Sequence, residues 1–173
     1  MDYITRYESP LGGITLAADG AALVGLWFDG QRHFAETLDS WHEECASLPI
    51  FGEAKRWLDL YFSGRDPGFT PRLAMRTTPF RKQVWEIMLA IPYGKTMTYG
   101  EIAKRMAETR PIASPQGSAR AVGGAVGHNS ISLIIPCHRV VGANGALTGY
   151  AAGIDRKMQL LRMERETVPC CYP

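Results

Sequence analysis

Long apolar runs are missing from this sequence of 173 residues, and the longest are short stretches such as Ala21–Phe28. A membrane-spanning helix needs about 20 consecutive, mostly apolar residues, so the sequence predicts none. The first residues also lack a basic segment followed by an apolar one, which argues against a secretory signal peptide. We therefore expect a cytoplasmic protein with no membrane partner.

Cysteine and excess charge are also scarce. Only 4 cysteines are present, and a reducing compartment argues against a disulfide framework; Cys170 and Cys171 fit a loose terminal tail. The formal net charge of +2 gives no overall attraction to nucleic acid or membranes. However, residues 1–77 carry 7 basic and 11 acidic side chains, whereas residues 78–173 carry 12 and 6. A polyanionic partner would therefore bind the second half.

The residues that are present can build a core, because 46% of them are hydrophobic. Alternating apolar and polar residues predict strands at Tyr3–Tyr7, Gly13–Ala17 and Leu23–Phe28, separated by turn sequences. Apolar residues recur at helical spacing over Glu53–Phe62, and Gly64 stands at the position of a C-terminal cap. The first part is thus predicted to be a small antiparallel meander with one helix.

The second half has the pattern of a mostly helical domain. Thr78–Pro79 suits an N-cap followed by proline, and Ile91–Gly94 ends that helix. Thr98–Glu101 forms a capping box for the next helix. The segment Thr109–Gly117 is rich in Pro, Ser and Gly, and a helix over Ser118–Asn129 follows it. The fold class is therefore α+β, with an N-terminal domain over 1–77 and a C-terminal domain over 78–173.

The helix that opens at Ser118 is almost bare of side chains. Gly123 and Gly124 each cost about 1 kcal/mol of helix stability relative to alanine, so this composition needs a reason. Tight packing on a neighbouring helix and close approach of another surface both remain open. Two helices in the basic half, the second carrying the single cation Arg120, suggest a helix-turn-helix that meets DNA. Such a slim helix suits wedging a duplex apart, so that a base leaves the stack, better than reading sequence.

Chemistry is expected at Pro136–Arg139, which follows a buried-type apolar run and is predicted to lie at the mouth of a strand. A thiol with a pKa of about 8.5 is a poor nucleophile until a base takes its proton, and His138 stands beside Cys137. Neighbouring side chains on an extended chain point apart, so a bridging water or a turn must join them. The alternative is a structural cysteine beside a hydrogen-bonded histidine.

Three further features follow this motif. Gly142–Gly145 is a hairpin signal, and Thr148–Gly153 is a loop of small residues around one tyrosine that could wall a flat pocket. The sequence Asp155–Glu166 predicts a final helix, in which Glu164 either orients His138 or is a solvated charge. Four residues share one face of this helix: Lys157, Leu160, Leu161 and Glu164.

Taken together, these motifs resemble the O6-alkylguanine-DNA alkyltransferases, whose active-site motif is similar to Pro136–Val141. The resemblance extends over residues 78–166, while the first half matches in length and in its strand-turn start Ser9–Gly12, as in the bacterial stand-alone members. It implies a ribonuclease H-like first domain and a winged helix-turn-helix second domain. The other matching segments, in family order, are Thr98–Tyr99, Ala119–Gly124, Asn129, Gly149–Tyr150 and Leu160–Glu164.

The resemblance implies direct reversal of damage in double-stranded DNA. An alkyl group would pass irreversibly from O6-alkylguanine, and from O4-alkylthymine, to Cys137 after the base flips from the minor groove. His138 would act as the base through a water, Glu164 would orient and charge the imidazole, and Asn129 would link the recognition helix to the active-site strand. Arg120 would replace the flipped base in the stack. No cofactor and no metal are implied.

The resemblance also implies which residues contact DNA and which line the substrate pocket. The remaining DNA-binding residues would be Thr98, Tyr99, Ala119, Ala121 and Gly123. The pocket residues would be Tyr99, Ser132, Val140, Tyr150 and Ala151. The protein would act once per molecule as a monomer, and cooperative binding to DNA stays open.

Two alternatives come from other classes of protein. A non-catalytic alkyltransferase-like lesion sensor would lack the cysteine, so the presence of Cys137 argues against it. A helix-turn-helix regulator with a structural cysteine would carry more base-reading side chains than Arg120. A zinc site at His42–Cys45 is not expected, because His33 is the only other candidate ligand in that region.

Overall fold

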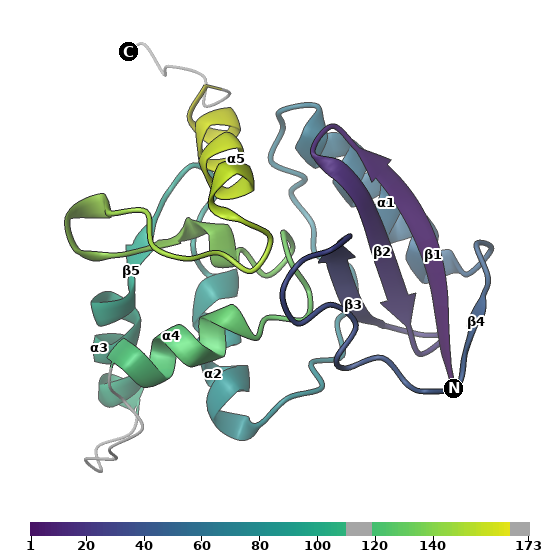
Figure 1. Cartoon of the computed structure of the whole chain (residues 1–173), viewed down its shortest axis with the longest axis horizontal. Helices are drawn as coiled ribbons and strands as arrows, with labels where there is room; N and C mark the ends of the chain where they lie inside the picture. The colour runs from purple at the N-terminus through teal and green to yellow at the C-terminus, as the bar shows by residue number, and fades with distance from the viewer. Residues whose placement is uncertain (110–118, 167–173) are drawn as a thin grey trace.

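The computed structural model of this chain describes residues 1–109 and 119–166 (Figure 1). A sheet with one helix forms one side of the molecule, and a group of helices forms the other. The predicted linker after Thr109 and the predicted helix start at Ser118 fall within residues 110–118, outside the described ranges. The two terminal cysteines fall outside them as well. Within those ranges, no helix is long and apolar enough to cross a membrane.

The predicted meander is confirmed. Its strands pair antiparallel in sequence order, with Tyr3 opposite Ala18 and Ile14 opposite Phe28. A short fourth strand, absent from the prediction, runs parallel to the first and gives the order β3-β2-β1-β4. It was missed because its three residues are all exposed and show no alternation. The strands are β1 (Asp2–Ser9), β2 (Gly12–Ala18), β3 (Leu23–Phe28) and β4 (His42–Glu44).

Helix α1 (Pro49–Phe62) covers one face of this sheet and starts four residues before the predicted Glu53. Pro49 occupies the first turn, where a missing backbone N–H costs nothing. The helix ends as predicted at Gly64, whose φ of +83° favours glycine. Its buried stripe consists of Ile50, Phe51, Ala54, Trp57, Leu58 and Tyr61.

The helices of the second half begin and end close to the predicted residues. The Thr78 hydroxyl accepts a hydrogen bond from the Arg81 N–H at 3.3 Å, as an N-cap should. The capping box is also present, because Thr98 N–H donates to Glu101 at 2.7 Å and Glu101 N–H donates to Thr98 Oγ1 at 3.1 Å. The helices are α2 (Pro79–Leu89), α3 (Tyr99–Thr109), α4 (Ala119–Gly127) and α5 (Ile154–Glu166).

Helix α4 packs against both α2 and α3 through its small residues. The indole N–H of Trp85 on α2 donates to the Ala125 carbonyl at 2.9 Å, which requires a close approach of the two helices. Val122, Ala125 and Val126 are buried on this side. Helix packing therefore explains part of the bare composition, while the opposite side of α4, with Gly124, stays exposed.

The segment before Cys137 is not the predicted strand. Ser132 N–H donates to the Leu26 carbonyl at 2.9 Å and Leu26 N–H to the Ser130 carbonyl at 2.9 Å, so the segment touches the edge of β3. It then turns at Leu133, where φ is +68°. Cys137 itself begins a 3-10 turn, η2 (Cys137–Arg139).

The predicted hairpin at Gly142–Gly145 is a turn without a second strand. Strand β6 (Val140–Val141) leads into it and pairs in parallel with β5 (Met97–Thr98). Gly142 N–H donates to the Ala146 carbonyl at 2.8 Å around the short 3-10 turn η3 (Ala143–Gly145). The chain after the turn is mostly exposed and continues as a loop, so it offers no returning strand.

One hydrophobic core connects the two halves. Buried residues of the sheet such as Ile14 and Leu26 belong to the same cluster as Trp85 of α2 and Leu160 of α5. Cys137 is a member of this cluster. The η2 turn therefore lies where the sheet side and the helical side meet.

Candidate active site

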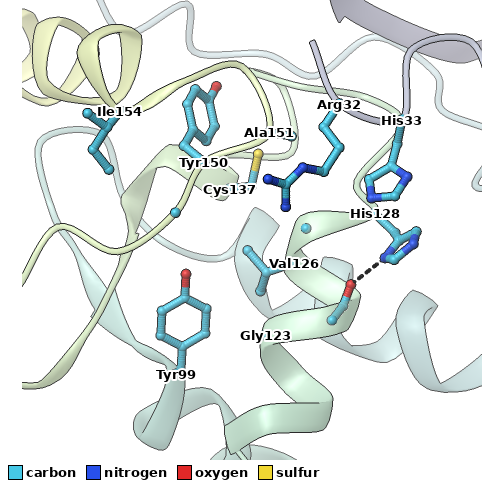
Figure 2. Close-up of a pocket in the computed structure, with 13 residues that line it drawn as sticks. Arg32, His33, Tyr99, Gly123, Val126, His128, Cys137, Tyr150, Ala151 and Ile154 are labelled. Carbon is cyan, nitrogen blue, oxygen red and sulfur yellow. Dashed lines mark hydrogen bonds between the residues drawn. The ribbon is translucent and has the colours of Figure 1, made fainter.

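Cys137 lies at a pocket of about 390 Å³ between the two halves of the molecule (Figure 2). Its side chain is buried, with a relative exposure of 3%. Figure 2 shows the sulfur facing the space between the Tyr150 loop and helix α4. Helices and the loop after η3 contribute most of the lining, including Tyr99, Gly123, Val126, Tyr150 and Ala151.

The environment of the Cys137 sulfur raises the pKa of the thiol overall, so the resting group is protonated. Burial raises the pKa of the thiol, whereas hydrogen bonding to Asn129 and the charge of Lys157 lower it. The hydroxyl of Tyr150 interacts with the sulfur and has no other partner among the described residues. A resting thiol that ionises when a base removes its proton fits this balance.

His138 follows the cysteine and is fully buried. Its Nε2 donates to Glu164 Oε1 at 2.7 Å, while its Nδ1 is buried and has no partner in the described parts of the chain. Because Glu164 can only accept when ionised, this bond assigns the proton of the neutral ring to Nε2. Burial lowers the pKa of His138, so the resting imidazole is neutral and Nδ1 can receive a proton.

Glu164 is held as a carboxylate by several donors. Burial alone would raise its pKa, but hydrogen bonds and charge from His138 and Arg139 lower it to about 2. Arg139 Nε donates to Oε2 at 3.0 Å and Arg139 Nη2 donates to Oε1 at 3.0 Å. The backbone N–H of Gly94 adds a donor to Oε2 at 3.1 Å. The predicted buried face of α5 is therefore confirmed, with Glu164 pointing at the imidazole.

Asn129 connects the end of α4 to the segment that carries the cysteine. Its Nδ2 donates to the Ile135 carbonyl at 2.7 Å, and its Oδ1 accepts from the Ile131 N–H at 3.0 Å. The side chain is buried, with 3% exposure. A shift of α4 would therefore move the backbone just before Cys137.

The residues predicted to contact DNA gather at α3 and α4. Ala119 and Arg120 are exposed at the start of α4, and Ala121 is half-buried beside them. A Cβ at Gly123 would come within 4.0 Å of the Tyr99 ring, so this glycine keeps the pocket wall thin. Thr98 caps α3 and thereby fixes the base of the Tyr99 side chain.

Two predicted pocket residues do not line the pocket. Ser132 is buried behind it, with its hydroxyl 3.4 Å from Gln31 Oε1, because its segment packs on β3. Val140 is also buried, and its carbonyl accepts from Lys157 Nζ at 2.6 Å. A carbonyl has two lone pairs, so this contact leaves one of them for another donor.

Sequence reasoning missed several residues of the site. Lys157 is fully buried, and burial lowers its pKa; the signal was a lysine on the same helix face as Leu160 and Leu161. Tyr61 of α1 donates to Glu164 Oε1 at 2.8 Å, but the sequence shows it only as one member of an apolar stripe. Arg32 and His33 reach the pocket from the loop after β3, and no pattern marks them.

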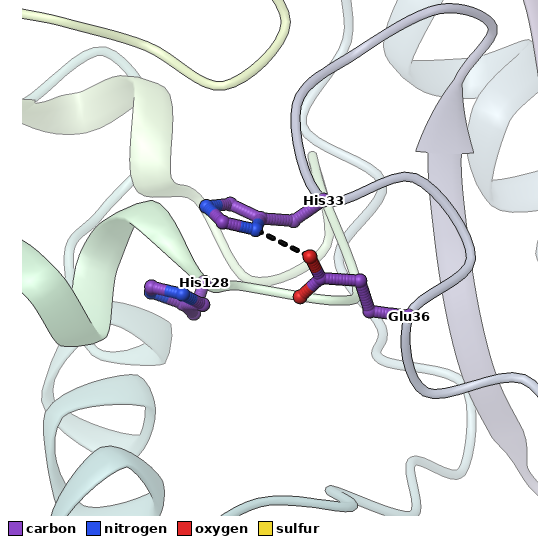
Figure 3. A group of neighbouring side chains, drawn as sticks. All are labelled: His33, Glu36 and His128. Carbon is purple, nitrogen blue, oxygen red and sulfur yellow. Dashed lines mark hydrogen bonds and ion pairs between the residues drawn. The ribbon is translucent and has the colours of Figure 1, made fainter.

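A second cluster joins this loop to the end of α4 (Figure 3). His33 Nδ1 pairs with Glu36 Oε1 at 2.7 Å, and the rings of His33 and His128 stack with centroids 4.0 Å apart. Their ligand-type atoms lie within 4.8 Å of one another. However, coordination of a metal ion requires the nitrogen lone pairs to point at one position. The lone pairs of two stacked rings lie side by side instead. The cluster therefore fits a contact between the two halves better than a metal site.

These features define a class of protein. Helix α4 is nearly bare of side chains and exposed on one side, and it lines a pocket that contains the Cys137 thiol, which is followed in the chain by a buried imidazole paired with a carboxylate. Such a combination fits a protein that binds DNA and uses a cysteine chemically.

Comparison with known proteins identifies the family. Residues 79–166 match the family described as 6-O-methylguanine DNA methyltransferase, DNA binding domain, and residues 3–75 match its ribonuclease-like domain. The chain therefore belongs to the 6-O-methylguanine DNA methyltransferase family.

Close relatives match over nearly the whole chain. A methylated-DNA–protein-cysteine methyltransferase from Methanosarcina acetivorans is 46% identical over 162 residues, which cover 94% of this chain and 97% of the relative. The Mycobacterium bovis protein of the same name is 43% identical, with coverages of 98% and 96%. A crystal structure of Mycobacterium tuberculosis OGT in complex with DNA superposes with a TM-score of 0.81 at 40% identity, with coverages of 97% and 96%.

Proposed function

We propose that the protein repairs DNA by direct reversal of damage, transferring the alkyl group of O6-alkylguanine, and of O4-alkylthymine, to Cys137. Membership of the methyltransferase family supports the reaction type. The observation that carries the choice of residue is the position of Cys137 in the pocket, beside a buried His138 whose free nitrogen is Nδ1. A lesion sensor that performs no chemistry would need neither a cysteine in the pocket nor a buried histidine with a free Nδ1 beside it.

The reaction begins with removal of the thiol proton. His138 Nδ1 takes it through a bridging water, and Glu164 stabilises the imidazolium that results. The thiolate of Cys137 attacks the alkyl carbon in line, a C–S bond forms, and the C–O bond breaks with its electron pair going to the base. The thiol proton ends on the guanine, which leaves as the normal base. The product is a thioether, which no group of the site can cleave, so each molecule reacts once.

The base must leave the duplex to reach the sulfur. Helix α4 is slim on its exposed side, and Arg120 is the long cation near its start, which suits entry into the minor groove and replacement of the extruded base. Tyr99 and Tyr150 supply aromatic walls for a flat purine. The pocket, the polar network and the helix all come from one chain, which supports action as a monomer, and we propose that this action takes place in the cytoplasm.

The two matched family regions meet between residues 75 and 79. This supports a domain boundary near residue 77, with domains over 1–77 and 78–173. In this division Cys137, His138 and Glu164 all belong to the second domain.

The test is to incubate the protein with a duplex that carries one O6-methylguanine and to analyse its peptides by mass spectrometry. We expect one added methyl group, located on Cys137. The Cys137→Ala variant should bind the duplex normally and take up no methyl group. Cys45→Ala is the matched control, because Cys45 is a free cysteine remote from the pocket, and it should react like the wild type. Methylation of another residue, or transfer by Cys137→Ala, would refute the proposal.

A further inference from the structure

The polar network of the site includes a hydroxyl from the other side of the molecule. Tyr61 lies on α1, the helix that covers the sheet, and its hydroxyl donates to Glu164 Oε1 at 2.8 Å (Figure 1 shows the two helices). The Tyr61 hydroxyl oxygen also lies 3.2 Å from His138 Nε2. Tyr61 is fully buried, so these contacts are shielded from water. The N-terminal part of the chain therefore touches the atoms that prepare the base.

We propose that Tyr61 is a positioning residue for the transfer reaction: it shares the charge of Glu164 with His138 and so sets how readily the imidazole takes the proton of Cys137. The inference rests on the proposed function. It assigns the N-terminal domain a part in the chemistry in addition to its part in the core.

The charge on one carboxylate oxygen is divided among its donors. Glu164 Oε1 receives His138 Nε2 at 2.7 Å, Tyr61 Oη at 2.8 Å and Arg139 Nη2 at 3.0 Å. When one donor is removed, less of the negative charge of Glu164 Oε1 is neutralised by hydrogen bonding. The oxygen then becomes a stronger acceptor for the donors that remain. The bond to His138 then favours the imidazolium more strongly, and the resting ring binds a proton at higher pH.

The tyrosine is suited to remain a neutral donor throughout the reaction. Burial and the charge of Glu164 raise the pKa of Tyr61 well above its usual value, so it does not ionise. Its ring is fixed by stacking on Trp57, with centroids 5.1 Å apart, and by edge contacts with Phe62 and Tyr93. The hydroxyl therefore keeps one direction while the imidazole changes charge.

The other groups around the imidazole are fixed by their own contacts. Arg139 is bound to Glu164 and to the Ile91 carbonyl at 2.8 Å, and Lys157 is bound to the Val140 carbonyl. Tyr61 takes no part in the Arg139 contacts with Glu164 Oε2 and the Ile91 carbonyl or in the Lys157 contact, and it shares only Glu164 Oε1 with Arg139. The charged and titratable groups that face His138 are thus Glu164 and Lys157 from α5, Arg139 and the adjacent Cys137 from η2, and Tyr61 from α1.

The test is the pH dependence of the single-turnover transfer rate with an O6-methylguanine duplex. In Tyr61→Phe the ring contacts remain and only the hydroxyl is lost. We expect the inflection on the acid side to move to higher pH by about half a unit, which is a roughly threefold loss of rate below the inflection. The rate above the inflection should stay close to that of the wild type.

Tyr7→Phe is the matched control. Tyr7 of β1 donates to Asp59 of α1 at 2.7 Å, outside the polar network, so removal of the Tyr7 hydroxyl should leave the pH profile unchanged. A second variant carries 3-fluorotyrosine at position 61, which keeps the shape and donates more strongly. Its inflection should move to lower pH.

The outcomes separate this inference from the proposed function. An unchanged inflection in Tyr61→Phe, or a rate lowered equally at every pH, would show a merely structural role and overturn the inference. The inference would also be overturned if the inflection moved in the same direction in Tyr61→Phe and in the protein with 3-fluorotyrosine at position 61. Absence of transfer in the wild type would instead refute the proposed function.

Discussion

The buried carboxylate of Glu164 allows a sharp prediction about stability. Glu164→Gln keeps the shape of the side chain and removes its charge. The side chains of Glu164 and Arg139 are 1% and 9% exposed, so the guanidinium would be left in a buried place without its counter-charge. Breaking a buried ion pair in this way costs about 3–5 kcal/mol of the free energy of unfolding. We expect a loss in that range at neutral pH.

The exposed pair on the same helix supplies the control. Glu166 accepts from Arg162 at 2.8 Å, and both side chains are mostly exposed. Water and salt screen such a pair, so Glu166→Gln should leave the unfolding curve unchanged. Both variants are measured by urea unfolding, followed by far-ultraviolet circular dichroism. Equal losses in the two variants would refute the reasoning from burial.

The pH dependence of the same measurement gives an independent check. The pKa of Glu164 is lowered to about 2 in the folded protein, compared with an ordinary value near 4.5. A lowered pKa stabilises the fold above the ordinary value, and this stabilisation is lost as the pH falls toward the folded value. The difference between wild type and Glu164→Gln should therefore narrow between about pH 4.5 and pH 2. A constant difference over this window would contradict the account.

Three further predictions follow from the site and the exposed helix. Arg120→Ala should slow repair of a duplex far more than the reaction with free O6-methylguanine, because only the duplex requires extrusion of the base; equal slowing would exclude a wedge. Lys157→Met should raise the pKa of the Cys137 thiol, because the charge of Lys157 lowers it, and should slow single-turnover transfer about tenfold; an unchanged rate would rule out an electrostatic role. Gly124→Ala meets no atom within 4 Å, so it should raise the free energy of unfolding by about 0.5–1 kcal/mol while weakening duplex binding in fluorescence anisotropy. An unchanged affinity of Gly124→Ala for the duplex would show that DNA does not contact the exposed side of α4.

Features that depend on neighbouring residues could be predicted from the sequence. The meander, the N-cap at Thr78 and the capping box of Thr98 and Glu101 each use groups a few residues apart, so their patterns are local. The buried face of α5 followed from helical spacing, and it placed Glu164 and Lys157 correctly on the inner side.

Features that depend on distant partners could not be predicted in this way. The apolar run before Cys137 has the composition of a strand, but its backbone partner is Leu26, more than 100 residues away, and the turn at Leu133 follows from that contact. The same limit applies to Tyr61 and Arg32, whose roles depend on how the two halves pack. A tyrosine in an apolar stripe carries no sign of the carboxylate that its hydroxyl meets.

The central claim is that one sulfur takes the alkyl group and keeps it. The direct test is a titration of a fixed amount of protein with duplex that carries radiolabelled O6-methylguanine, with counting of the label bound to protein. The account predicts that label rises in proportion to the lesion and stops at one methyl group per molecule, all in the peptide that contains Cys137. Continued loss of methyl groups from DNA beyond that point, with the protein still active, would contradict it.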